Sequence, residues 1–192
     1  MTLIFATHNK NKLLEIQSQL PHPFELQSLK DLAYFKNIPE PYLTVEENAA
    51  TKANTIYNAF SCACFSDDTG LFVNALEGAP GVFSARYAGE NAKADQNMDK
   101  LLKAMTFATD RSAYFKTCIA LKLDNEIKYF SGVVHGSIAK AKKGAQGFGY
   151  DPIFIPEGYQ ESFAELPLEI KQKIGHRGKA IKQLIDYLTH LQ

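Results

Sequence analysis

The sequence predicts an α/β fold that contains an antiparallel hairpin. Short apolar runs alternate with stretches in which apolar residues recur at helical spacing, a pattern typical of strands and helices that follow one another along a chain. In contrast, residues 113–123 and 127–138 are long alternating runs separated by a short polar turn. The chain has 192 residues, of which 45% are hydrophobic, enough for one ordinary domain with a substantial core or for two closely joined lobes.

The first third of the chain predicts two strands and two helices. Residues 3–6 form a short apolar run, and an apolar stripe over 13–20 predicts a helix that ends before Pro21. Residues 24–29 are consistent with a second strand. Apolar and small residues recur at helical spacing over 45–60 and predict a long, regular helix.

The rest of the chain predicts further elements of both kinds. They are an extended segment over 71–76, a helix over 95–105, strands over 113–123 and 127–138 joined by a turn at Asp124 and Asn125, and a C-terminal helix, with a further apolar run over 153–155. No internal repeat or linker interrupts this order, so we expect a single domain over residues 1–192.

Composition and charge exclude several classes of function. The 21 Lys and Arg residues balance 21 Asp and Glu residues, so no net field attracts the protein to nucleic acid or to a membrane surface. No apolar run approaches the length of a membrane span, and the first residues become polar too early for a signal sequence. The odd count of three cysteines agrees with a cytoplasmic protein, in which we expect Cys62 and Cys64 to be small buried hydrophobes rather than zinc ligands.

Two adjacent carboxylates, Asp67 and Asp68, follow one apolar run and precede a Thr-Gly pair and a second apolar run. This placement predicts that a buried strand ends at the acids, where packed carboxylates would raise each other's pKa unless a cation lay between them. Mg²⁺ that also carries a phosphate substrate is the simplest such cation. A solvated turn with two acids is the alternative interpretation.

The segment 7–12 joins the first strand directly to the first helix. Its backbone N–H groups, hydrogen-bonding side chains and ammonium groups together predict a phosphate-binding site. The alternative is an ordinary Thr or Asn helix cap beside solvated lysines. The candidate residues of this segment are Thr7, His8, Asn9, Lys10, Asn11 and Lys12.

Glu47 has two interpretations. Thr44 followed by Glu47 three positions later matches a capping box, so the carboxylate could serve only to begin a helix. Alternatively, Glu47 faces Asp67 and Asp68 as a third oxygen ligand, because helix starts and strand ends often meet at α/β sites. Glu46 competes for that role.

A glycine-rich stretch over 144–152 precedes the apolar run 153–155. Its glycines allow the backbone to approach a ligand closely. Phe148 lies between two of them, where it is poorly placed to anchor a core and is a candidate for stacking on a base. A hairpin-like connection with an incidental Phe is the alternative.

Six motifs run in order from residue 7 to residue 178 and cover essentially the whole chain. They are Thr7-x-Asn9-x-x-Lys12, Glu47-Asn48-Ala49, Ser66-Asp67-Asp68-Thr69-Gly70, Gly78-Ala79-Pro80-Gly81 with Ser84-Ala85-Arg86-Tyr87, Gly147-Phe148-Gly149-Tyr150-Asp151-Pro152, and His176-Arg177-Gly178. Together they resemble the inosine triphosphate pyrophosphatase family, whose members hydrolyse non-standard purine nucleoside triphosphates.

The resemblance implies an elongated mixed β-sheet flanked by helices, with two lobes, a central substrate cleft and a homodimeric assembly. It implies Mg²⁺-dependent hydrolysis between the α- and β-phosphates of inosine, deoxyinosine or xanthosine triphosphate, yielding the monophosphate and pyrophosphate. By motif, Asp68 is the proton acceptor and a metal ligand, with Glu47 and Asp67 assisting at the metal. The resemblance also places other residues beside the segment 7–12 at the substrate. They are Thr69 and the nucleoside-binding residues Phe148, Gly149, Tyr150, Asp151, Lys171, His176 and Arg177.

Charge and hydrogen-bonding capacity refine this expectation. A triphosphate brings roughly four negative charges, which one Mg²⁺ with Lys12 and either Lys10 or Lys52 would complement. The donors of His176 and Arg177 suit the O6 acceptor of a 6-keto purine and disfavour adenine, which would leave buried donors unpaired.

Some residues depart from the family pattern, and two other functions remain open. His8 and Asn11 stand where small residues are common, and Gly175 stands where Ser or Asn often precedes His-Arg. A related nucleotide pyrophosphatase of the septum-inhibitor type would prefer modified pyrimidine or methylated nucleotides, but the loop 147–152 argues against it. A non-catalytic nucleotide sensor would have no need of two adjacent acids.

Overall fold

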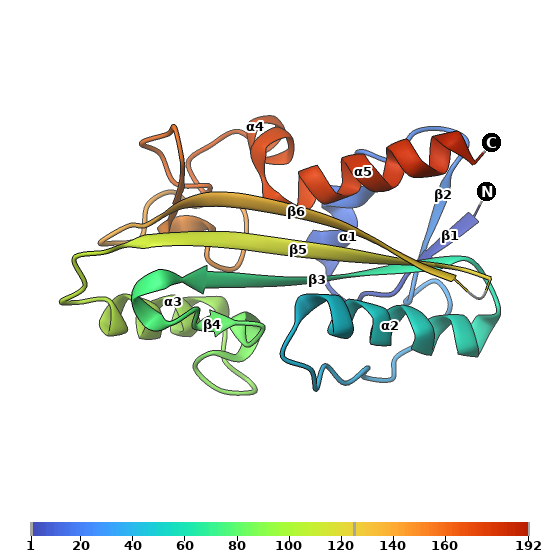
Figure 1. Ribbon diagram of the computed structural model, residues 1–192, viewed down its shortest axis with the longest axis horizontal. Coiled ribbons are helices and arrows are strands. Elements are labelled where there is room, and N and C mark those ends of the chain that lie inside the picture. Colours follow the sequence, from blue (N-terminus) through green and yellow to red (C-terminus); the bar gives the residue numbers. More distant parts are fainter. Residues whose placement is uncertain (1, 125, 192) are drawn as a thin grey trace. The chain divides into compact units, whose positions relative to one another are not determined.

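The computed structural model describes residues 2–124 and 126–191, which form an α/β fold built on a mixed sheet (Figure 1). The strands are β1 (Thr2–Phe5), β2 (Glu25–Ser28), β3 (Cys64–Val73), β4 (Pro80–Gly81), β5 (Ser112–Leu123), β6 (Glu126–Ile138) and β7 (Phe154–Pro156). The helices are α1 (Lys10–Gln17), α2 (Val45–Phe60), α3 (Ala94–Ala104), α4 (Leu168–Ile174) and α5 (His176–His190), with short 3-10 turns at Asn74–Leu76, Ser84–Arg86 and Asp151–Ile153. The predicted class, a mixed sheet flanked by helices, is confirmed.

The strands follow the order β2-β1-β3-β5-β6-β7, and β4 pairs with β3. β1 is parallel to both of its neighbours, with Phe5 opposite Ser28 of β2 and opposite Phe65 of β3. β4 is antiparallel to β3, and β7 is antiparallel to β6. The chain divides into two compact units, the first comprising Met1–Asp68, Thr117–Gly132 and Lys179–Gln192, and the second Thr69–Lys116 and Val133–Gly178.

In the first unit, β1 contributes side chains to two different cores, because successive residues of a strand point to opposite faces. Leu3 and Phe5 belong to a cluster with Leu184 of α5. Ile4 belongs to a second cluster with Ile56 of α2. The helices α2 and α5 therefore cover opposite faces of this part of the sheet (Figure 1).

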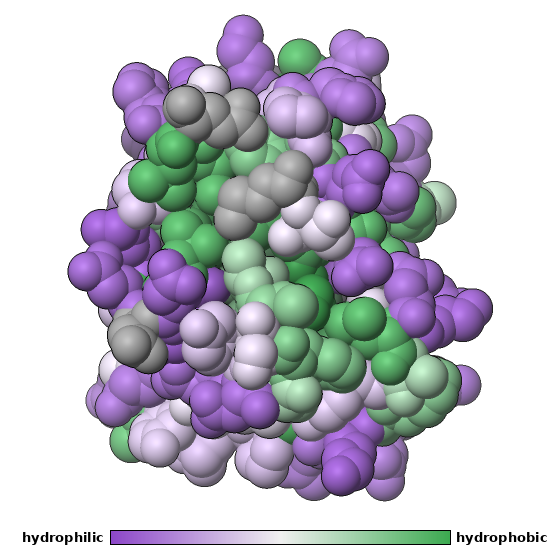
Figure 2. All heavy atoms as spheres, turned by 90° about the vertical axis from the view of Figure 1, so that its right-hand side faces the viewer, coloured by the Kyte–Doolittle hydropathy of each residue, from purple (hydrophilic) through white to green (hydrophobic). Residues whose placement is uncertain are grey.

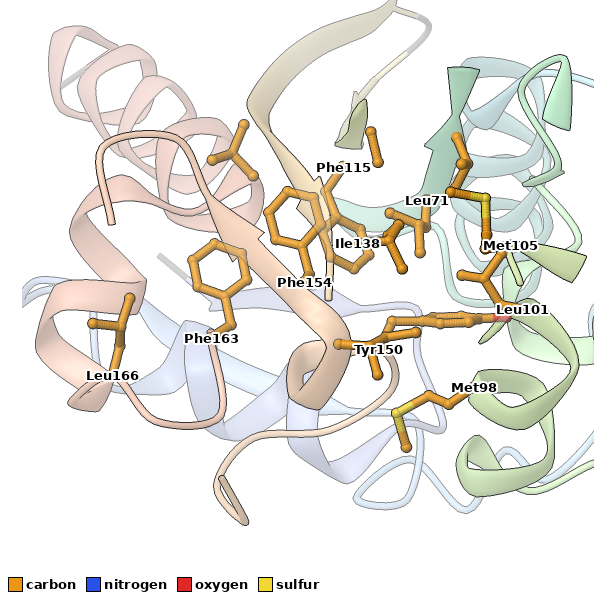
Figure 3. Close-up of a cluster of buried hydrophobic side chains, with 14 residues drawn as sticks. Leu71, Met98, Leu101, Met105, Phe115, Ile138, Tyr150, Phe154, Phe163 and Leu166 are labelled. Atoms are coloured by element: carbon orange, nitrogen blue, oxygen red, sulfur yellow. The ribbon is translucent and has the colours of Figure 1, made fainter. Parts of the chain in front are cut away.

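The second unit has a core rich in aromatic residues. Figure 3 shows Phe115 of β5 beside Phe154 and Phe163, with Tyr150 lying toward the side chains of α3. The ring centroids of Phe115 and Phe154 are 4.7 Å apart, and those of Phe154 and Phe163 are 5.2 Å apart. Such pairs stabilise a core by about 0.5–1.5 kcal/mol beyond their buried area. This packing fixes both ends of the segment that follows the glycine-rich loop.

Several local expectations differ from the structure. The segment expected to be extended over 71–76 is a strand only to Val73 and continues as the 3-10 turn Asn74–Leu76. β3 continues without interruption through Asp67 and Asp68, so the acids lie inside a strand and not at its end. Cys62 is exposed and precedes β3, whereas Cys64 is buried, and burial raises the pKa of its thiol to about 12. Helix α4 was not expected. Asn125, assigned to the hairpin turn, lies outside the described residues.

The surface mixes polar and apolar side chains. On the face shown in Figure 2, hydrophobic side chains gather in the middle and hydrophilic side chains surround them. Across residues 2–124 and 126–191, no helix has both the length and the apolar character needed to cross a bilayer.

Candidate active site

β3 presents its two acids to opposite faces of the sheet. Asp67 Oδ1 lies 2.9 Å from the ammonium nitrogen of Lys12 on α1. Asp68 Oδ1 accepts a hydrogen bond of 3.0 Å from the ammonium of Lys52 on α2. Both carboxylates are buried. Contrary to the expectation of packed neighbours that share one cation, each acid has a lysine of its own.

Lys52 joins two carboxylates of the first unit. Its ammonium donates to Asp68 and also to Glu40. Asp68 is only 6% exposed, and its second oxygen, Oδ2, has no hydrogen-bond partner among the described residues. Leaving such a buried group unsatisfied costs about 1–3 kcal/mol, and more when it is charged. The geometry therefore favours a cation, a water or a ligand atom as the partner of this oxygen.

Burial and neighbouring charges shift the pKa values of this group. Burial raises the pKa of Asp68, and the ammonium groups of Lys52 and Lys12 oppose this rise without cancelling it. Burial disfavours the charged form of Lys52, but the charges of Asp68 and Glu40 outweigh burial and raise the pKa of Lys52. Lys52 is therefore a cation at neutral pH, and Asp68 is a stronger base than an exposed aspartate.

Glu40 was not among the residues that the sequence singled out. Asn48 of α2 holds its loop in place, since Asn48 Oδ1 accepts from the Tyr42 N–H at 3.0 Å and Asn48 Nδ2 donates to the Tyr42 carbonyl at 3.0 Å. Asn48 is 1% exposed. The only signal in the sequence is that Glu40 stands between two prolines, which restrict the backbone on either side.

Asn9 caps α1 at the predicted phosphate-binding segment. Its side-chain oxygen accepts from the backbone N–H groups of Asn11 at 2.9 Å and Lys12 at 3.3 Å. Thr7 Oγ1 accepts from the Asn9 N–H at 3.2 Å. The capping interpretation of Asn9 is thus supported, while Lys12 extends from the first turn to the buried Asp67.

The remaining candidates of this segment are at the surface. Lys10 and Asn11 are exposed, and Nε2 of the exposed His8 lies 3.1 Å from the carbonyl oxygen of Lys36. Exposed donors next to a helix N-terminus are suited to an anion that arrives from solvent. Phosphate binding by His8, Lys10 and Asn11 stays a prediction.

Glu47 lies in the first turn of α2 and is exposed. Thr44 is the N-cap residue, and its Oγ1 accepts from the Glu47 N–H at 3.2 Å. The Thr44 hydroxyl in turn donates to Glu47 Oε2 at 2.5 Å. The capping interpretation of Glu47 therefore has direct geometric support, and its role as a metal ligand stays a prediction.

In the second unit, one oxygen of Asp151 binds two groups. Asp151 Oδ2 accepts from the backbone N–H of Phe148 at 2.8 Å and from the ammonium of Lys171 at 2.7 Å. Asp151 is 3% exposed and Lys171 is 7% exposed. Gly147 and Gly149 have φ values of +76° and +67°, which favour glycine, and a side chain at Gly147 would overlap Asp151. The loop is thus fixed around this carboxylate.

Two cations approach the ring of Phe148. The distances to the ring centroid are 4.8 Å from Lys171 Nζ and 5.3 Å from Arg177 Cζ. Arg177 also donates from Nη2 to Thr69 Oγ1 at 3.3 Å. A cation near an aromatic face is attracted by the ring quadrupole. The structure therefore brings together three of the residues predicted for the nucleoside end with Thr69, which was predicted to contact the substrate.

Tyr150 and His176 are engaged in the core of the second unit. The Tyr150 hydroxyl donates to the Ser84 carbonyl at 2.8 Å, and burial raises the pKa of this tyrosine. The His176 ring stacks on Phe115, with centroids 4.5 Å apart and planes inclined by 16°. Both side chains thus have structural contacts, and direct contact of either with a base stays a prediction.

The donor set of the first unit suits a hard metal ion that arrives with a phosphate. Within the described parts of the chain, no group of three or more His, Cys, Asp or Glu side chains is placed to hold a metal. Mg²⁺, however, is usually bound by one or two carboxylates plus substrate phosphates and waters. Glu40 and Asp68, which meet at one ammonium while Asp68 Oδ2 has no partner in the described chain, fit this arrangement.

Comparison with known proteins gives full-length matches. The model of the Ham1 family matches residues 3–187. A dITP/XTP pyrophosphatase of Flavobacterium johnsoniae is 54% identical over 189 residues, covering 98% of both chains. Another of Flavobacterium psychrophilum is 53% identical, covering 99% of this chain and 100% of the relative. The solved Ham1 protein of Staphylococcus aureus is 37% identical with a TM-score of 0.91, covering 100% of both chains, and the HAM1 protein of Coxiella burnetii is 37% identical with a TM-score of 0.92, covering 99% of both.

Proposed function

Because this chain belongs to the Ham1 family, we propose that it hydrolyses the non-standard purine nucleoside triphosphates ITP, dITP and XTP to the monophosphate and pyrophosphate. The names of the Flavobacterium relatives, at 54% and 53% identity, support this substrate class. The observation in the chain that carries the proposal is Asp68, a buried carboxylate with Lys52 on one oxygen and no partner for the other in the described chain. Such an enzyme removes non-standard nucleoside triphosphates from the nucleotide pool.

Asp68 and Glu40 hold Mg²⁺ in this proposal, together with phosphate oxygens of the substrate. Glu40 takes the place that the sequence alone assigned to Glu47 and Asp67, because Glu47 caps its helix and Asp67 faces the other side of the sheet. When bound, the ion supplies positive charge that neutralises the phosphates and the leaving pyrophosphate.

Asp68 accepts a proton from the attacking water. Burial raises the pKa of Asp68, which makes it a better proton acceptor than an exposed aspartate. The water oxygen forms the new bond to phosphorus as its proton passes to Asp68, and pyrophosphate leaves with the electrons of the broken bond. Lys12 and Lys52 position and neutralise the phosphates, which is the main task of a protein in phosphoryl transfer.

The second unit recognises the base. Phe148 offers a ring for stacking, which gives affinity to any base and cannot discriminate by itself. Lys171 and Arg177 offer only donors, and donors match the O6 acceptor of hypoxanthine or xanthine. The 6-amino group of adenine would face these donors with a donor of its own. We therefore expect ATP and dATP to be poor substrates.

The family resemblance also supports a homodimer that acts in the cytoplasm. Light scattering of the purified protein would give twice the 21.4 kDa mass of one chain if the dimer forms. A mass of one chain at assay concentration would contradict this part of the proposal.

The decisive experiment is incubation with a panel of nucleoside triphosphates, with and without Mg²⁺. Pyrophosphate and inorganic phosphate are measured separately, and the nucleotide product is identified. We expect dITP, ITP and XTP to give the monophosphate and pyrophosphate only when Mg²⁺ is present. Release of inorganic phosphate with a diphosphate product, or equal rates on ATP, would overturn the proposed reaction or its specificity.

A further inference from the structure

Lys52 is in an unusual position for a lysine. It lies inside α2 and is 7% exposed, and its ammonium bonds to Glu40 and Asp68 from different segments of the chain. The two carboxylates that fit a metal ion thus already share a cation supplied by the protein. A divalent ion that takes oxygens of both carboxylates must compete with this ammonium.

We infer that Lys52 is an internal stand-in for the metal ion, which holds Glu40 and Asp68 together in the free protein and weakens metal binding until a nucleotide is present. This inference rests on the metal site of the proposed function. A triphosphate gives the displaced ammonium new oxygen acceptors. Metal and nucleotide therefore bind with positive cooperativity, each favouring the other to the same extent.

The local charge balance supports this role. Asp67, Asp68 and Glu40 bring three negative charges, against the positive charges of Lys12 and Lys52. Without the ammonium of Lys52, Asp68 and Glu40 would repel each other across a buried space. Lys52 thus stabilises the free protein by reducing the repulsion between these two carboxylates.

Lys12 does not share this role, although it also contacts a buried aspartate. Its ion-pair partner is Asp67, which points to the opposite face of β3 from Asp68, and the Lys12 charge lowers the pKa of Asp68, whereas Lys52 donates directly to both Asp68 and Glu40. The competition for both carboxylates is therefore assigned to Lys52. A matched control is Lys122, a half-buried lysine of the same unit that lies 5.3 Å from the ring centroid of Tyr57 on the same helix.

The test is titration of the nucleotide-free protein with Mn²⁺, which is followed by electron paramagnetic resonance. Lys52→Met removes the competing cation, and we expect it to tighten Mn²⁺ binding by about tenfold or more, within the range of roughly 5- to 150-fold typical of coupling between sites. Lys122→Met removes the same charge and should leave the affinity unchanged. Unchanged or weaker Mn²⁺ binding in Lys52→Met would overturn the inference.

Thermal unfolding provides a readout that does not depend on activity. Without metal, Lys52→Met should unfold at a lower temperature than the wild type, and Mn²⁺ should raise its unfolding temperature more than that of the wild type. If Lys52→Met does not fold, Lys52→Gln, which retains a polar donor without the charge, takes its place in both measurements. An equal response of variant and wild type to Mn²⁺ counts against the stand-in role.

A non-hydrolysable dITP analogue tests the cooperativity. It should tighten Mn²⁺ binding to the wild type, and it should do so less in Lys52→Met, in which no competing ammonium remains to be displaced. Pyrophosphate release from dITP by the wild type, with equal Mn²⁺ affinities in the two proteins, would overturn the inference and leave the proposed function standing. Tighter Mn²⁺ binding in Lys52→Met, in a protein that does not cleave dITP, would support the inference and overturn the proposed substrate.

Discussion

The two units satisfy their buried carboxylates in different ways, although each pairs an acid with a lysine from a neighbouring helix. Asp151 places one oxygen between the Phe148 N–H and the Lys171 ammonium, and thereby fixes a loop. Asp68 shares its lysine with Glu40 and keeps a second oxygen without a partner in the described chain. The Asp151 carboxylate is therefore bound within the protein before a ligand arrives, whereas one oxygen of Asp68 can still bind a positively charged group. This difference is expected if one unit recognises a base and the other performs chemistry on a phosphate.

The largest effect should come from Asp68→Asn. The amide keeps the shape of the side chain but loses the charge and the proton acceptor, so kcat should fall by about 10²- to 10⁴-fold. Because Lys52 still pairs with Glu40 after this change, we expect a smaller loss of thermal stability than for a buried lysine that loses its carboxylate partner. Turnover of the variant within about tenfold of the wild type, a difference of roughly 1.4 kcal/mol in the barrier, would remove Asp68 from the mechanism.

Arg177→Ala tests whether the second unit reads the base. Loss of the guanidinium should lower kcat/KM for dITP far more than for dATP, because only the 6-keto base can accept its hydrogen bonds. Each unmade buried bond costs about 1–3 kcal/mol. Arg177→Lys keeps the charge but not the planar guanidinium. Its ratio of dITP to dATP activity should therefore lie between those of the wild type and Arg177→Ala. A ratio of dITP to dATP activity that survives Arg177→Ala would place base reading elsewhere.

Asp151→Asn tests the carboxylate that binds both the Phe148 N–H and the Lys171 ammonium. The amide oxygen can still accept from the Phe148 N–H, but the buried ion pair with Lys171 is broken, and breaking such a pair commonly costs about 3–5 kcal/mol. We expect a lower unfolding temperature and a higher KM for dITP with a nearly unchanged kcat. Asp95→Asn is the control, because the Asp95–Lys142 pair of the same unit is more exposed and contributes about 0–1 kcal/mol. Equal effects of the two substitutions would remove the distinction between the two units.

The smallest effect should come from Glu47→Gln, measured beside Glu40→Gln. Gln still serves at the third position of a capping box, so Glu47→Gln should leave stability and the Mg²⁺ requirement unchanged. Glu40→Gln should raise the Mg²⁺ concentration needed for half-maximal activity by about tenfold, or roughly 1.4 kcal/mol. If Glu47→Gln alone raises that requirement, the assignment made from the sequence is right and that of Glu40 is wrong.

The periodic elements could be predicted because a single physical rule governs each of them. The helix expected over 45–60 matches α2 (Val45–Phe60), and the alternating runs match β5 and β6 to within one residue at each end. The α/β class follows from these patterns, while the motifs, and not the periodicity, indicated the family. The alternation that identified β5 would also have separated Asp67 from Asp68, had the strand been extended through them.

The features of the site that the sequence did not predict depend on contacts between residues that are distant in sequence. Glu40 lies in a loop without periodicity, and it is linked to Asp68 only because the Lys52 ammonium donates to both carboxylates. Likewise, the motif that contains His176 gave no sign that its ring stacks on Phe115, which is 61 positions away in the chain, while its contact with a base stays a prediction. Local sequence patterns carry no information about such pairs. The roles of individual site residues were therefore less predictable than the elements that carry them.

The start of α5 limits which substitutions this protein can tolerate. A side chain at Gly178 would overlap the carbonyl oxygen of Gln172 in α4, so the two helices meet there with room for a hydrogen atom only. Gly178 has no functional group, yet replacing it would displace its neighbours His176 and Arg177 together. A screen of random variants should thus recover Gly178 among the inactive alleles, where it would mimic the loss of a catalytic residue without being one.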